Sequence, residues 1–182
     1  MTRVLIPLAQ GCEELEAVTI IDLMRRAGIE VVTAGLDDRL VAASRGVRLM
    51  PDVQLDEVID QEFDMLVLPG GLPGADNLDG DTRIHALLNK MADSGRYTAA
   101  ICAAPKVLGH AGLLNGKVAT GYPGVLDSMV LPTTEVSRDA VVVDGRVVTS
   151  RGPGTAMDFA MILIALLLGE EKRREVEQAL VR

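Results

Sequence analysis

Residues 99–106 read AAICAAPK, and this stretch determines how the rest of the chain is interpreted. The apolar run Tyr97–Ile101 predicts a buried strand that stops at Cys102. Small, helix-compatible residues follow at once, so we expect a sharp turn at the cysteine and a helix that begins one or two residues later. Pro105 fits the first turn of that helix, where no intrahelical N–H donor is needed. A thiol at this point faces free backbone N–H groups and the positive end of the helix dipole, and both favour a reactive thiolate.

Apolar runs elsewhere predict further strands, and the spacing of apolar residues between them predicts helices. The expected strands are residues 3–8, 30–34, 47–50, 63–68, 97–101 and 117–120, with a hairpin over 140–149 around Asp144-Gly145. The expected helices are residues 13–28, 55–59, 82–94, 103–111, 123–130, 156–168 and 170–182. The Gly- and Pro-containing segments expected to form loops are residues 72–81 and 151–155.

Strands and helices alternate along the chain, and the strand sequences LVLP and AAIC are apolar on both faces. This pattern is typical of an α/β fold with a mainly parallel sheet and helices on both faces. No repeat or linker divides the sequence, so residues 1–182 are expected to form a single domain. In such sheets ligands bind at the carboxyl ends of the strands. The loops expected to meet there are residues 11–16, 69–74, 102–104 and 151–155.

The amino-acid composition argues against nucleic-acid and membrane partners. The formal net charge of −8 repels a phosphate backbone and an anionic membrane surface. Two Phe, two Tyr and no Trp leave little from which to build a base-stacking surface for single-stranded nucleic acid. The longest apolar run, residues 160–168, is too short to span a bilayer.

The cysteine content and the first residues predict a cytoplasmic, reducing location. Two cysteines in 182 residues do not make a disulfide framework. The opening sequence MTRVLIPLAQGCEE becomes polar and acidic too soon for a signal peptide.

Cys102 is the first candidate for chemistry, because a strand, a cysteine and a helix in succession resemble the nucleophile elbow of hydrolases. The alternative is a small buried hydrophobic residue, which is what most free cysteines are. A nucleophile normally needs a base, and the chain has two histidines, His85 and His110. His85 is expected on the surface of a helix, and His110 lies on the order of 10 Å from Cys102 along the next helix. We therefore do not expect a catalytic triad.

Three glutamates, Glu13, Glu14 and Glu16, follow the first predicted strand at the same edge of the sheet. We expect Glu13 and Glu14 to be solvated residues of a first helical turn, where carboxylates suit the helix dipole. Glu16 is expected to point over the strand ends. A glutamate held near a thiolate at low dielectric tends to stay protonated, so it can donate a hydrogen bond and later shuttle a proton.

Backbone groups can complete such a site. Gly71 lacks a Cβ and can bring its N–H close to a bound oxyanion, and the N–H of Ala103 is the second candidate donor. By itself, however, a Gly-Gly pair after a strand is usually only a turn. The sequence has neither a GxxxxGK[ST] nor a GxGxxG motif, residues 75–81 fail the spacing of a calcium loop, and the cysteines and histidines lack zinc-ligand spacing. We therefore expect no cofactor and no metal.

Six segments taken together resemble the ThiJ/PfpI superfamily, and within it the DJ-one branch, which holds the parkinsonism-associated deglycase and the bacterial YajL chaperone. The segments are GCEELEAV, LMRRAGIEV, ASRGV, LVLPGGLPGA, AAICAAP and TSRGPGTAMDFA. The resemblance covers nearly the whole chain. It implies a flavodoxin-like sandwich that forms a homodimer.

The resemblance also implies roles for single residues. Cys102 is the reactive nucleophile and Glu16 is the protonated acid beside it. Gly71 and Ala103 supply backbone donors around the sulfur. The residues implied to border the pocket or to attract a small anion are Arg26, Arg45, Pro153 and Gly154. The two arginines are implied to lie near the site and the dimer boundary.

Three positions depart from the family patterns. Protease-like members have histidine directly after the cysteine, whereas this chain has Ala103, so peptidase activity is not expected. Some members of the DJ-one branch have histidine where this chain has Tyr122, so any role of that histidine is lost or replaced. Cys12 stands where relatives often have a small residue. It is interpreted either as a resolving cysteine or, as we favour, as a small turn residue.

Two functions of different classes use the same pair of residues. In the first, an enzyme, Cys102 adds to a small aldehyde such as methylglyoxal or acts on early glycation adducts, and Glu16 moves protons until a hydroxy acid such as lactate leaves. In the second, a stress sensor and chaperone for unfolded client proteins, Cys102 is oxidised to a sulfinic acid that Glu16 stabilises. A third interpretation, a non-catalytic α/β binding scaffold, requires an unreactive Cys102.

Overall fold

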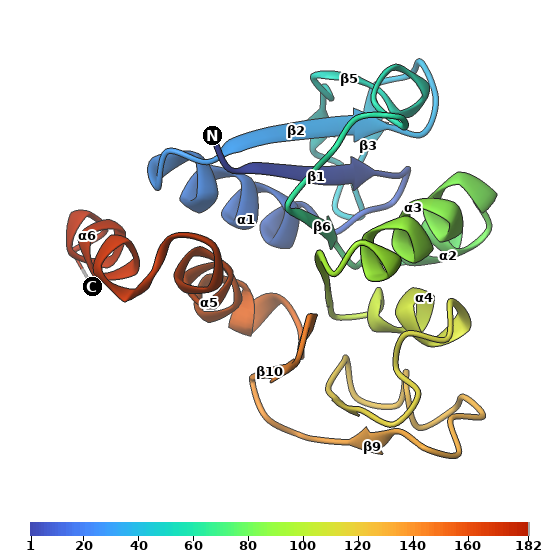
Figure 1. Cartoon of the computed structure of the whole chain (residues 1–182). Helices are drawn as coiled ribbons and strands as arrows, with labels where there is room; N and C mark the ends of the chain where they lie inside the picture. The colour runs from blue at the N-terminus through green and yellow to red at the C-terminus, as the bar shows by residue number, and fades with distance from the viewer. Residues whose placement is uncertain (182) are drawn as a thin grey trace.

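The computed structural model describes residues 1–181, and its central feature is a sheet of seven strands (Figure 1). The strands lie in the order β10-β11-β7-β6-β1-β2-β5. Their bounds are β1 Arg3–Leu8, β2 Glu30–Gly35, β5 Val53–Gln54, β6 Met65–Leu68, β7 Tyr97–Ile101, β10 Val141–Asp144 and β11 Val147–Ser150. Neighbouring strands are parallel except β10 and β11, which form the antiparallel hairpin predicted around Asp144-Gly145. The mainly parallel sheet is confirmed.

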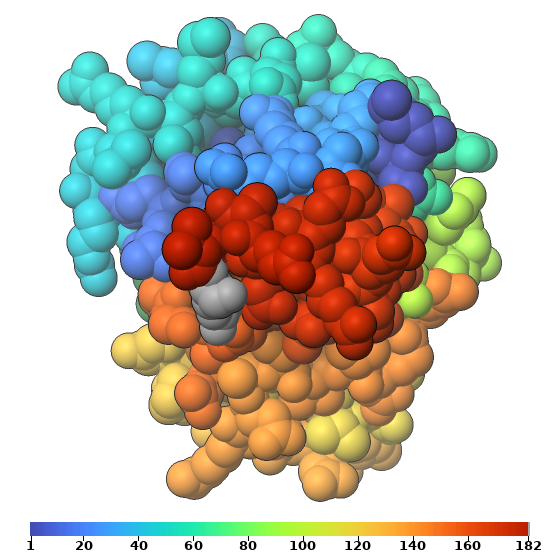
Figure 2. All heavy atoms as spheres, turned by 90° about the vertical axis from the view of Figure 1, so that its left-hand side faces the viewer, coloured from blue at the N-terminus to red at the C-terminus, as the bar shows by residue number. Residues whose placement is uncertain are grey.

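Helices cover both faces of this sheet (Figure 1). On one face α1 packs against α5, which in turn contacts α6. On the other face α3 and α4 pack against β7, and α2 lies against both of these helices. Their bounds are α1 Glu14–Arg26, α2 Gly74–Asp79, α3 Thr82–Asp93, α4 Pro105–His110, α5 Ala156–Leu168 and α6 Glu170–Ala179. Figure 2 shows the red residues of α6 on the outer surface, between the blue N-terminal part and the orange segment that precedes α5.

The core is built almost entirely from aliphatic side chains. β6 is buried along its whole length, and the register of its neighbour β1 aligns Val4 with Met65 and Leu5 with Leu66. Phe159 of the apolar helix α5 is fully buried beneath the same sheet. Burying side chains of this size stabilises the fold by roughly 1.5–3 kcal/mol each. Among residues 1–181, no helix combines the length and the apolar character needed to cross a bilayer.

The carboxyl ends of the central strands bring the four predicted loops together. Glu13 N–H donates to the Gly70 carbonyl at 2.9 Å, which joins the loop after β1 to the loop after β6. Cys102 N–H donates to the Ser150 carbonyl at 2.9 Å, which joins the turn after β7 to the loop after β11. This is the edge at which parallel sheets bind ligands.

Two small sheets and two 3-10 turns lie outside the main sheet. Their bounds are β3 Val41–Ala42 with β4 Arg48–Leu49, β8 Val118–Ala119 with β9 Glu135–Val136, η1 Leu55–Glu57 and η2 Pro153–Thr155. The strands predicted at 47–50 and 117–120 and the helix predicted at 55–59 are therefore present but shorter than expected. The sequence does not predict β3, β5 or β9, because a two-residue strand has no alternation to detect.

The loop predicted over residues 72–81 is wrong, since α2 forms there. Its first residue, Gly74, approaches the neighbouring turn so closely that a Cβ would lie 2.5 Å from Cys12 Cα. Ala75 and Leu78 are fully buried. Tertiary packing therefore selects a helix where the Gly, Pro and Asp content locally indicates a loop.

The helix predicted over residues 123–130 is also wrong, and the segment forms consecutive turns. Gly124 has a φ of +87°, a left-handed conformation that a helix cannot contain, and its N–H donates to Asp127 Oδ2 at 3.2 Å. Leu126 is the one buried residue of the segment. Without a buried apolar face, a short helix has nothing to stabilise it.

Two further helices are shorter than predicted. α4 begins at Pro105, and residues 102–104 form a turn, so the predicted start lies one or two residues too early. α6 ends at Ala179. Arg182, the last residue of the predicted 170–182 helix, lies outside the described residues.

Candidate active site

Cys102 occupies a strained turn at the carboxyl end of β7. Its φ is +63°, in the left-handed region that non-glycine residues seldom adopt, at a cost of about 1–2 kcal/mol. Its N–H donates to the Ser150 carbonyl at 2.9 Å, and its carbonyl accepts Tyr122 N–H at 2.7 Å. The side chain is 7% exposed. The strand–turn–helix order of a nucleophile elbow is therefore present, and the strain marks Cys102 as a candidate functional residue.

Glu16 is fully buried beside Cys102. Glu13 caps α1 by accepting Glu16 N–H at 2.9 Å, which fixes the first turn of the helix. From that turn, Glu16 Oε2 accepts Gly70 N–H at 2.9 Å, and the carboxyl group hydrogen-bonds with the Cys102 side chain. Among the described residues, Glu16 Oε1 has no hydrogen-bond partner. One buried oxygen thus stays open to a proton or a ligand atom.

Gly70 and Gly71 allow the backbone to approach the pair. A Cβ on Gly70 would lie 2.6 Å from Cys102 Cβ and 2.8 Å from Glu16 Oε2. Gly71 has a φ of +90°, and a Cβ there would lie 2.4 Å from a backbone nitrogen of the neighbouring loop. The N–H groups of Gly71 and Ala103 both hydrogen-bond to the Cys102 sulfur. Both N–H groups therefore lie at the sulfur, and their role as oxyanion donors stays a prediction.

Burial controls the protonation of the pair. It raises the pKa of Glu16 to about 7, and hydrogen bonds from Cys102 and Gly70 offset only part of that rise. Burial, followed by the negative charge of Glu16, raises the pKa of the Cys102 thiol to about 12, against the lowering effect of the two N–H groups. The pKa therefore moves opposite to the direction predicted from a helix start. The main reason is the burial of the thiol, and α4, which begins three residues beyond Cys102, has only six residues.

One proton can nevertheless change places within the pair. The charge of Glu16 raises the pKa of Cys102 only while the carboxyl group is ionised. When the proton moves from sulfur to Glu16, whose neutral form burial favours, that repulsion ends and the N–H groups of Gly71 and Ala103 stabilise the thiolate. A thiolate with a protonated glutamate is thus accessible at unchanged net charge. This arrangement suits addition of sulfur to an electrophilic carbon.

The chain is similar over nearly its whole length to proteins of one family. The model of the DJ-1/PfpI family matches residues 2–166. The chain belongs to this family. It is 43% identical over 180 residues to Protein DJ-1 homolog A of Arabidopsis thaliana, covering 98% of this chain and 46% of that relative, so it spans about half the relative's length. It is 37% identical over 163 residues to Glutathione-independent glyoxalase DJR-1.2 of Caenorhabditis elegans, with 90% and 87% covered.

Solved structures of DJ-1 proteins share the fold. The crystal structure of Drosophila melanogaster DJ-1beta matches with a TM-score of 0.94 at 41% identity, covering 99% of this chain and 97% of that one. Oxidised Toxoplasma gondii DJ-1 matches with a TM-score of 0.94 at 38% identity, covering 100% and 98%. The predicted family and the flavodoxin-like fold are confirmed, whereas closeness to the YajL chaperone stays a prediction.

A second buried carboxylate of this DJ-1/PfpI chain lies on the same helical turn as Glu16. The prediction that Glu14 is solvated is wrong, since it is 9% exposed. Its carboxylate accepts Arg45 N–H at 2.9 Å and the Ser44 hydroxyl at 3.1 Å. Burial acts to raise the pKa of Glu14, but these hydrogen bonds prevail and hold it below its usual value. The sequence carries no signal for this contact, because Arg45 lies 31 residues away.

The structure separates Arg26 from the Cys102 site within one chain. Arg26 lies at the carboxyl end of α1, about 15 Å along the helix from Glu16, and pairs with Asp22 at 2.6 Å. Arg45 is exposed, on the turn that Glu14 holds. The roles that the resemblance implies for both arginines stay predictions.

Pro153 and Gly154 lie in η2, directly after the strand whose last carbonyl accepts the Cys102 N–H. Tyr122 packs against the same segment, since a Cβ on Gly152 would lie 3.4 Å from the tyrosine ring. The Tyr122 side chain is 52% exposed. A half-exposed aromatic ring thus lies over this loop. That Pro153 and Gly154 border the pocket stays a prediction.

Both histidines contact Asp79 at the end of α2. His85 Nε2 lies 2.8 Å from the Asp79 carbonyl oxygen, and His110 Nδ1 lies 2.7 Å from Asp79 Oδ2. These contacts tie α3 and α4 to α2, and neither histidine makes a hydrogen bond to Cys102 among the described residues. Across residues 1–181, no group of three or more His, Cys, Asp or Glu side chains is arranged to hold a metal ion.

Cys12 is a fully buried turn residue with a free thiol. Burial, with a smaller contribution from the charge of Glu14, raises the pKa of this thiol to about 12. Gly74 packs directly on the Cys12 backbone. These features fit the favoured interpretation of Cys12 as a small turn residue.

Proposed function

We propose that this protein is a cofactor-free enzyme that converts small reactive dicarbonyls, such as methylglyoxal, to hydroxy acids such as lactate. The observation that carries the proposal is the Cys102–Glu16 pair, held against the N–H groups of Gly71 and Ala103. It combines a nucleophile, a proton carrier and two oxyanion donors. The name of the Caenorhabditis elegans relative, a glutathione-independent glyoxalase, supports the same chemistry.

The first half of the reaction is covalent addition. A proton moves from the Cys102 sulfur to Glu16, and the sulfur attacks the aldehyde carbon. A C–S bond forms, and the carbonyl electron pair becomes an oxyanion that accepts hydrogen bonds from Gly71 and Ala103. Glu16 then protonates this oxygen, which leaves a neutral hemithioacetal and a carboxylate base.

The second half is proton transfer and release. Glu16 removes the hydrogen of the former aldehyde carbon and delivers a proton to the adjacent carbon through an enediol, which yields a thioester. Water cleaves the C–S bond, lactate leaves, and the Cys102 thiol is restored. The net change is addition of one water molecule to methylglyoxal, so the balance requires neither an oxidant nor a reductant.

Removal of early glycation adducts is an extension of the same step. A reversible adduct of methylglyoxal on an amine releases the aldehyde, and capture by Cys102 draws that equilibrium toward the free amine. Cys102 is only 7% exposed, which admits a small aldehyde more readily than an adduct attached to a protein. We therefore expect the free dicarbonyl to be the better substrate.

Lactate formation from methylglyoxal tests the proposal. Native protein is compared with Cys102→Ser and Glu16→Gln, and Cys12→Ser serves as the matched control for a cysteine outside the site. Native protein and the control are expected to form lactate, whereas Cys102→Ser loses activity by roughly 10³-fold or more. Lactate formation by the native protein no faster than in buffer would refute the proposal.

We propose in addition that two copies associate through α1. Leu15 and Val18 on this helix are 52% and 46% exposed, and apolar side chains that gather on one surface favour association. Light scattering is expected to show a dimer for the native protein and a monomer for Val18→Glu. Val130→Glu, at a residue that is 94% exposed in another segment, is the matched control and should stay dimeric. A monomeric native protein contradicts this part of the proposal.

A redox-regulated chaperone is the second candidate, and the free oxygen of Glu16 favours it. A sulfinic acid at Cys102 adds two oxygens, and Glu16 Oε1, without a partner among the described residues, can share a proton with one of them. The predicted cytoplasmic location supplies the reduced starting state. This candidate also extends the list of partners to unfolded client proteins.

Mild peroxide followed by mass spectrometry tests the sensor. The Cys102 peptide is expected to gain two oxygens in the native protein, and Glu16→Gln is expected to change that product. Oxidation that falls first on Cys12 contradicts the proposal. Aggregation of an unfolded client, measured with reduced and with oxidised protein, tests the chaperone role.

A further inference from the structure

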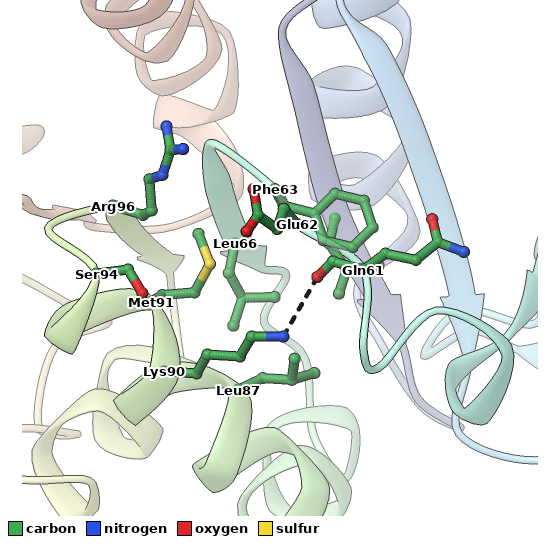
Figure 3. A pocket seen from close by; sticks show the side chains of 10 residues that line it. Gln61, Glu62, Phe63, Leu66, Leu87, Lys90, Met91, Ser94 and Arg96 are labelled. Atoms are coloured by element: carbon green, nitrogen blue, oxygen red, sulfur yellow. Dashed lines mark hydrogen bonds between the residues drawn. The ribbon is translucent and has the colours of Figure 1, made fainter.

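A cavity of about 140 Å³ lies beside α3 (Figure 3). It is at the amino-terminal ends of the strands, the edge of the sheet opposite Cys102. Phe63 precedes β6 and Arg96 precedes β7, so the cavity lies where these strands begin. Cys102, by contrast, follows the last residue of β7. The cavity is therefore separate from the candidate active site, and the proposed function gives it no role.

Five apolar side chains form the inner walls of the cavity. The side chains that form them are each at most 6% exposed, and they are Leu5, Phe63, Leu66, Leu87 and Met91. The Arg3 guanidinium lies over the Phe63 ring, 4.8 Å from its centroid, and holds it in place. An engineered apolar cavity of about 150 Å³ in another protein binds benzene. The cavity therefore has room for a single six-membered ring.

Lys90 lies at the opening of the cavity, and its ammonium group has N–H donors that make no strong hydrogen bond. Its Nζ is 3.5 Å from the Gln61 carbonyl oxygen, marked by the dashed line in Figure 3, and 3.5 Å from the Ile59 carbonyl oxygen. Both distances are at the upper limit of a hydrogen bond. No ion pair found within residues 1–181 includes Lys90. Arg96, on the same rim, is already paired with Asp64 at 2.7 Å. Lys90 is thus the cation that can receive an anionic group.

We propose that this cavity binds a small aromatic monocarboxylate, with the ring among the apolar walls and the carboxylate on Lys90. An aromatic ring gains from contact with the Phe63 ring and with the Met91 sulfur. Glu62 also lines the cavity and repels a carboxylate, so the anionic group is directed to the Lys90 side of the mouth. A ligand of this class joins a one-ring apolar body to one negative charge.

Benzoate is the probe, and benzyl alcohol and benzylamine test the charge. Binding is followed by chemical-shift changes of the Leu66, Leu87 and Met91 methyl groups, and a ligand of this size is expected to bind in roughly the millimolar range. Benzoate is expected to bind more tightly than either analogue. Absence of shifts at these methyl groups, or equal binding of benzyl alcohol, overturns the proposal. Tighter binding of benzylamine overturns it as well, since Glu62 would then be the partner.

Two surface substitutions sharpen the test. Lys90→Gln is expected to weaken benzoate binding about three- to fivefold, the range for a partly exposed charge pair. Glu62→Gln is expected to leave binding unchanged or to tighten it. Lys172→Gln on α6 is the matched control and should have no effect. Unchanged affinity in Lys90→Gln, or weaker binding in Glu62→Gln, contradicts the assignment.

The cavity and the active site can fail independently. Cys102→Ser is expected to bind benzoate with the same affinity as the native protein, whatever its activity toward methylglyoxal. Met91→Phe fills the cavity and is expected to abolish the methyl shifts of Leu66 and Leu87, with folding checked by its melting temperature. Benzoate binding that persists unchanged in Met91→Phe places the ligand elsewhere and overturns the proposal.

Discussion

Glu14 and Glu16 stand two residues apart on the first turn of α1, and each is buried, yet their surroundings act on them in opposite directions. Glu14 accepts hydrogen bonds from the Ser44 hydroxyl and the Arg45 N–H, and its pKa is held below the usual value. Glu16 accepts one backbone N–H and faces the Cys102 thiol, and burial raises its pKa to about 7.

The difference shows that the depth of burial and the number of hydrogen-bond donors together decide what a buried carboxylate does. A carboxylate with several donors stays ionised and holds a turn in place. A carboxylate with one N–H donor and a thiol stays close to its titration point near neutral pH, where it can give and take a proton. Glu14 therefore fits a structural role, and Glu16 fits the proton-transfer role proposed for it.

The largest expected effect is a difference in methylglyoxal turnover between variants of Glu16 and of Glu14. Glu16→Gln removes the proton carrier, and methylglyoxal turnover is expected to fall by roughly 10²-fold or more. Glu14→Gln leaves the Cys102 pair intact and should retain turnover within a few-fold of native. Lactate formation measured side by side on the two variants checks this. Equal losses in both would mean that Glu16 acts only through the fold.

The pH dependence of stability is expected to differ in sign between the two residues. The pKa of Glu16 is raised in the folded state, from 4.5 to about 7, so the folded state binds the proton more tightly. Its stabilising contribution is present below pH 4.5 and is lost as the pH rises toward 7. The loss amounts to at most about 3 kcal/mol. The pKa of Glu14 is lowered, so its contribution is present above pH 4.5 and is lost as the pH falls through its folded value.

Urea unfolding of the native protein and both variants from about pH 3 to pH 8 measures these slopes. The stability of the native protein relative to Glu16→Gln is expected to fall as the pH rises from 4.5 to 7. Relative to Glu14→Gln it is expected to rise with pH at the acid end. If the stability difference between native protein and variant changed with pH in the same direction for Glu14→Gln and Glu16→Gln, the comparison would be contradicted.

A smaller effect concerns stability at a single pH. Glu14→Gln keeps the shape of the side chain but replaces one acceptor oxygen with an NH₂ group, which faces donors on the Ser44–Arg45 turn. The expected loss at pH 7 is about 1–3 kcal/mol of unfolding free energy. Arg26→Gln is a suitable control, because its exposed ion pair with Asp22 is worth less than about 1 kcal/mol. A loss in Glu14→Gln no greater than in this control would show that the turn does not depend on the carboxylate.

Local sequence patterns predict the parts of the site that neighbouring residues determine. The apolar run before Cys102 and the small residues after it predict the turn, and the glycines after β6 predict the close backbone approach. The turn and the close backbone approach both depend on residues within a few positions of one another. Together with the resemblance, they predict that Cys102, Glu16 and Gly71 lie at one edge of the sheet.

Contacts between distant residues explain the failures. Glu14 reads as a solvated first-turn residue because its partner Arg45 lies 31 positions away. The sequence predicts a loop where α2 forms, because the helix depends on packing against Cys12, which lies far away in the sequence. The thiol pKa was predicted in the wrong direction because a helix start is visible in the sequence, whereas the depth of burial of Cys102 and Glu16 is not.

The smallest expected effect concerns the third glutamate of the turn. Glu13 Oε2 accepts the Glu16 N–H at 2.9 Å, so it caps α1 and sets the angle at which Glu16 leaves the helix. Glu13→Ala is expected to cost about 1 kcal/mol of unfolding free energy, the usual value of a lost N-cap, and to lower turnover much less than Glu16→Gln does. Glu13→Asp retains a capping carboxylate and should restore most of the stability. Glu13→Ala that stays folded but loses as much activity as Glu16→Gln would contradict this expectation. Glu13 and Glu16 would then act together in the reaction, and Glu14 alone would be structural.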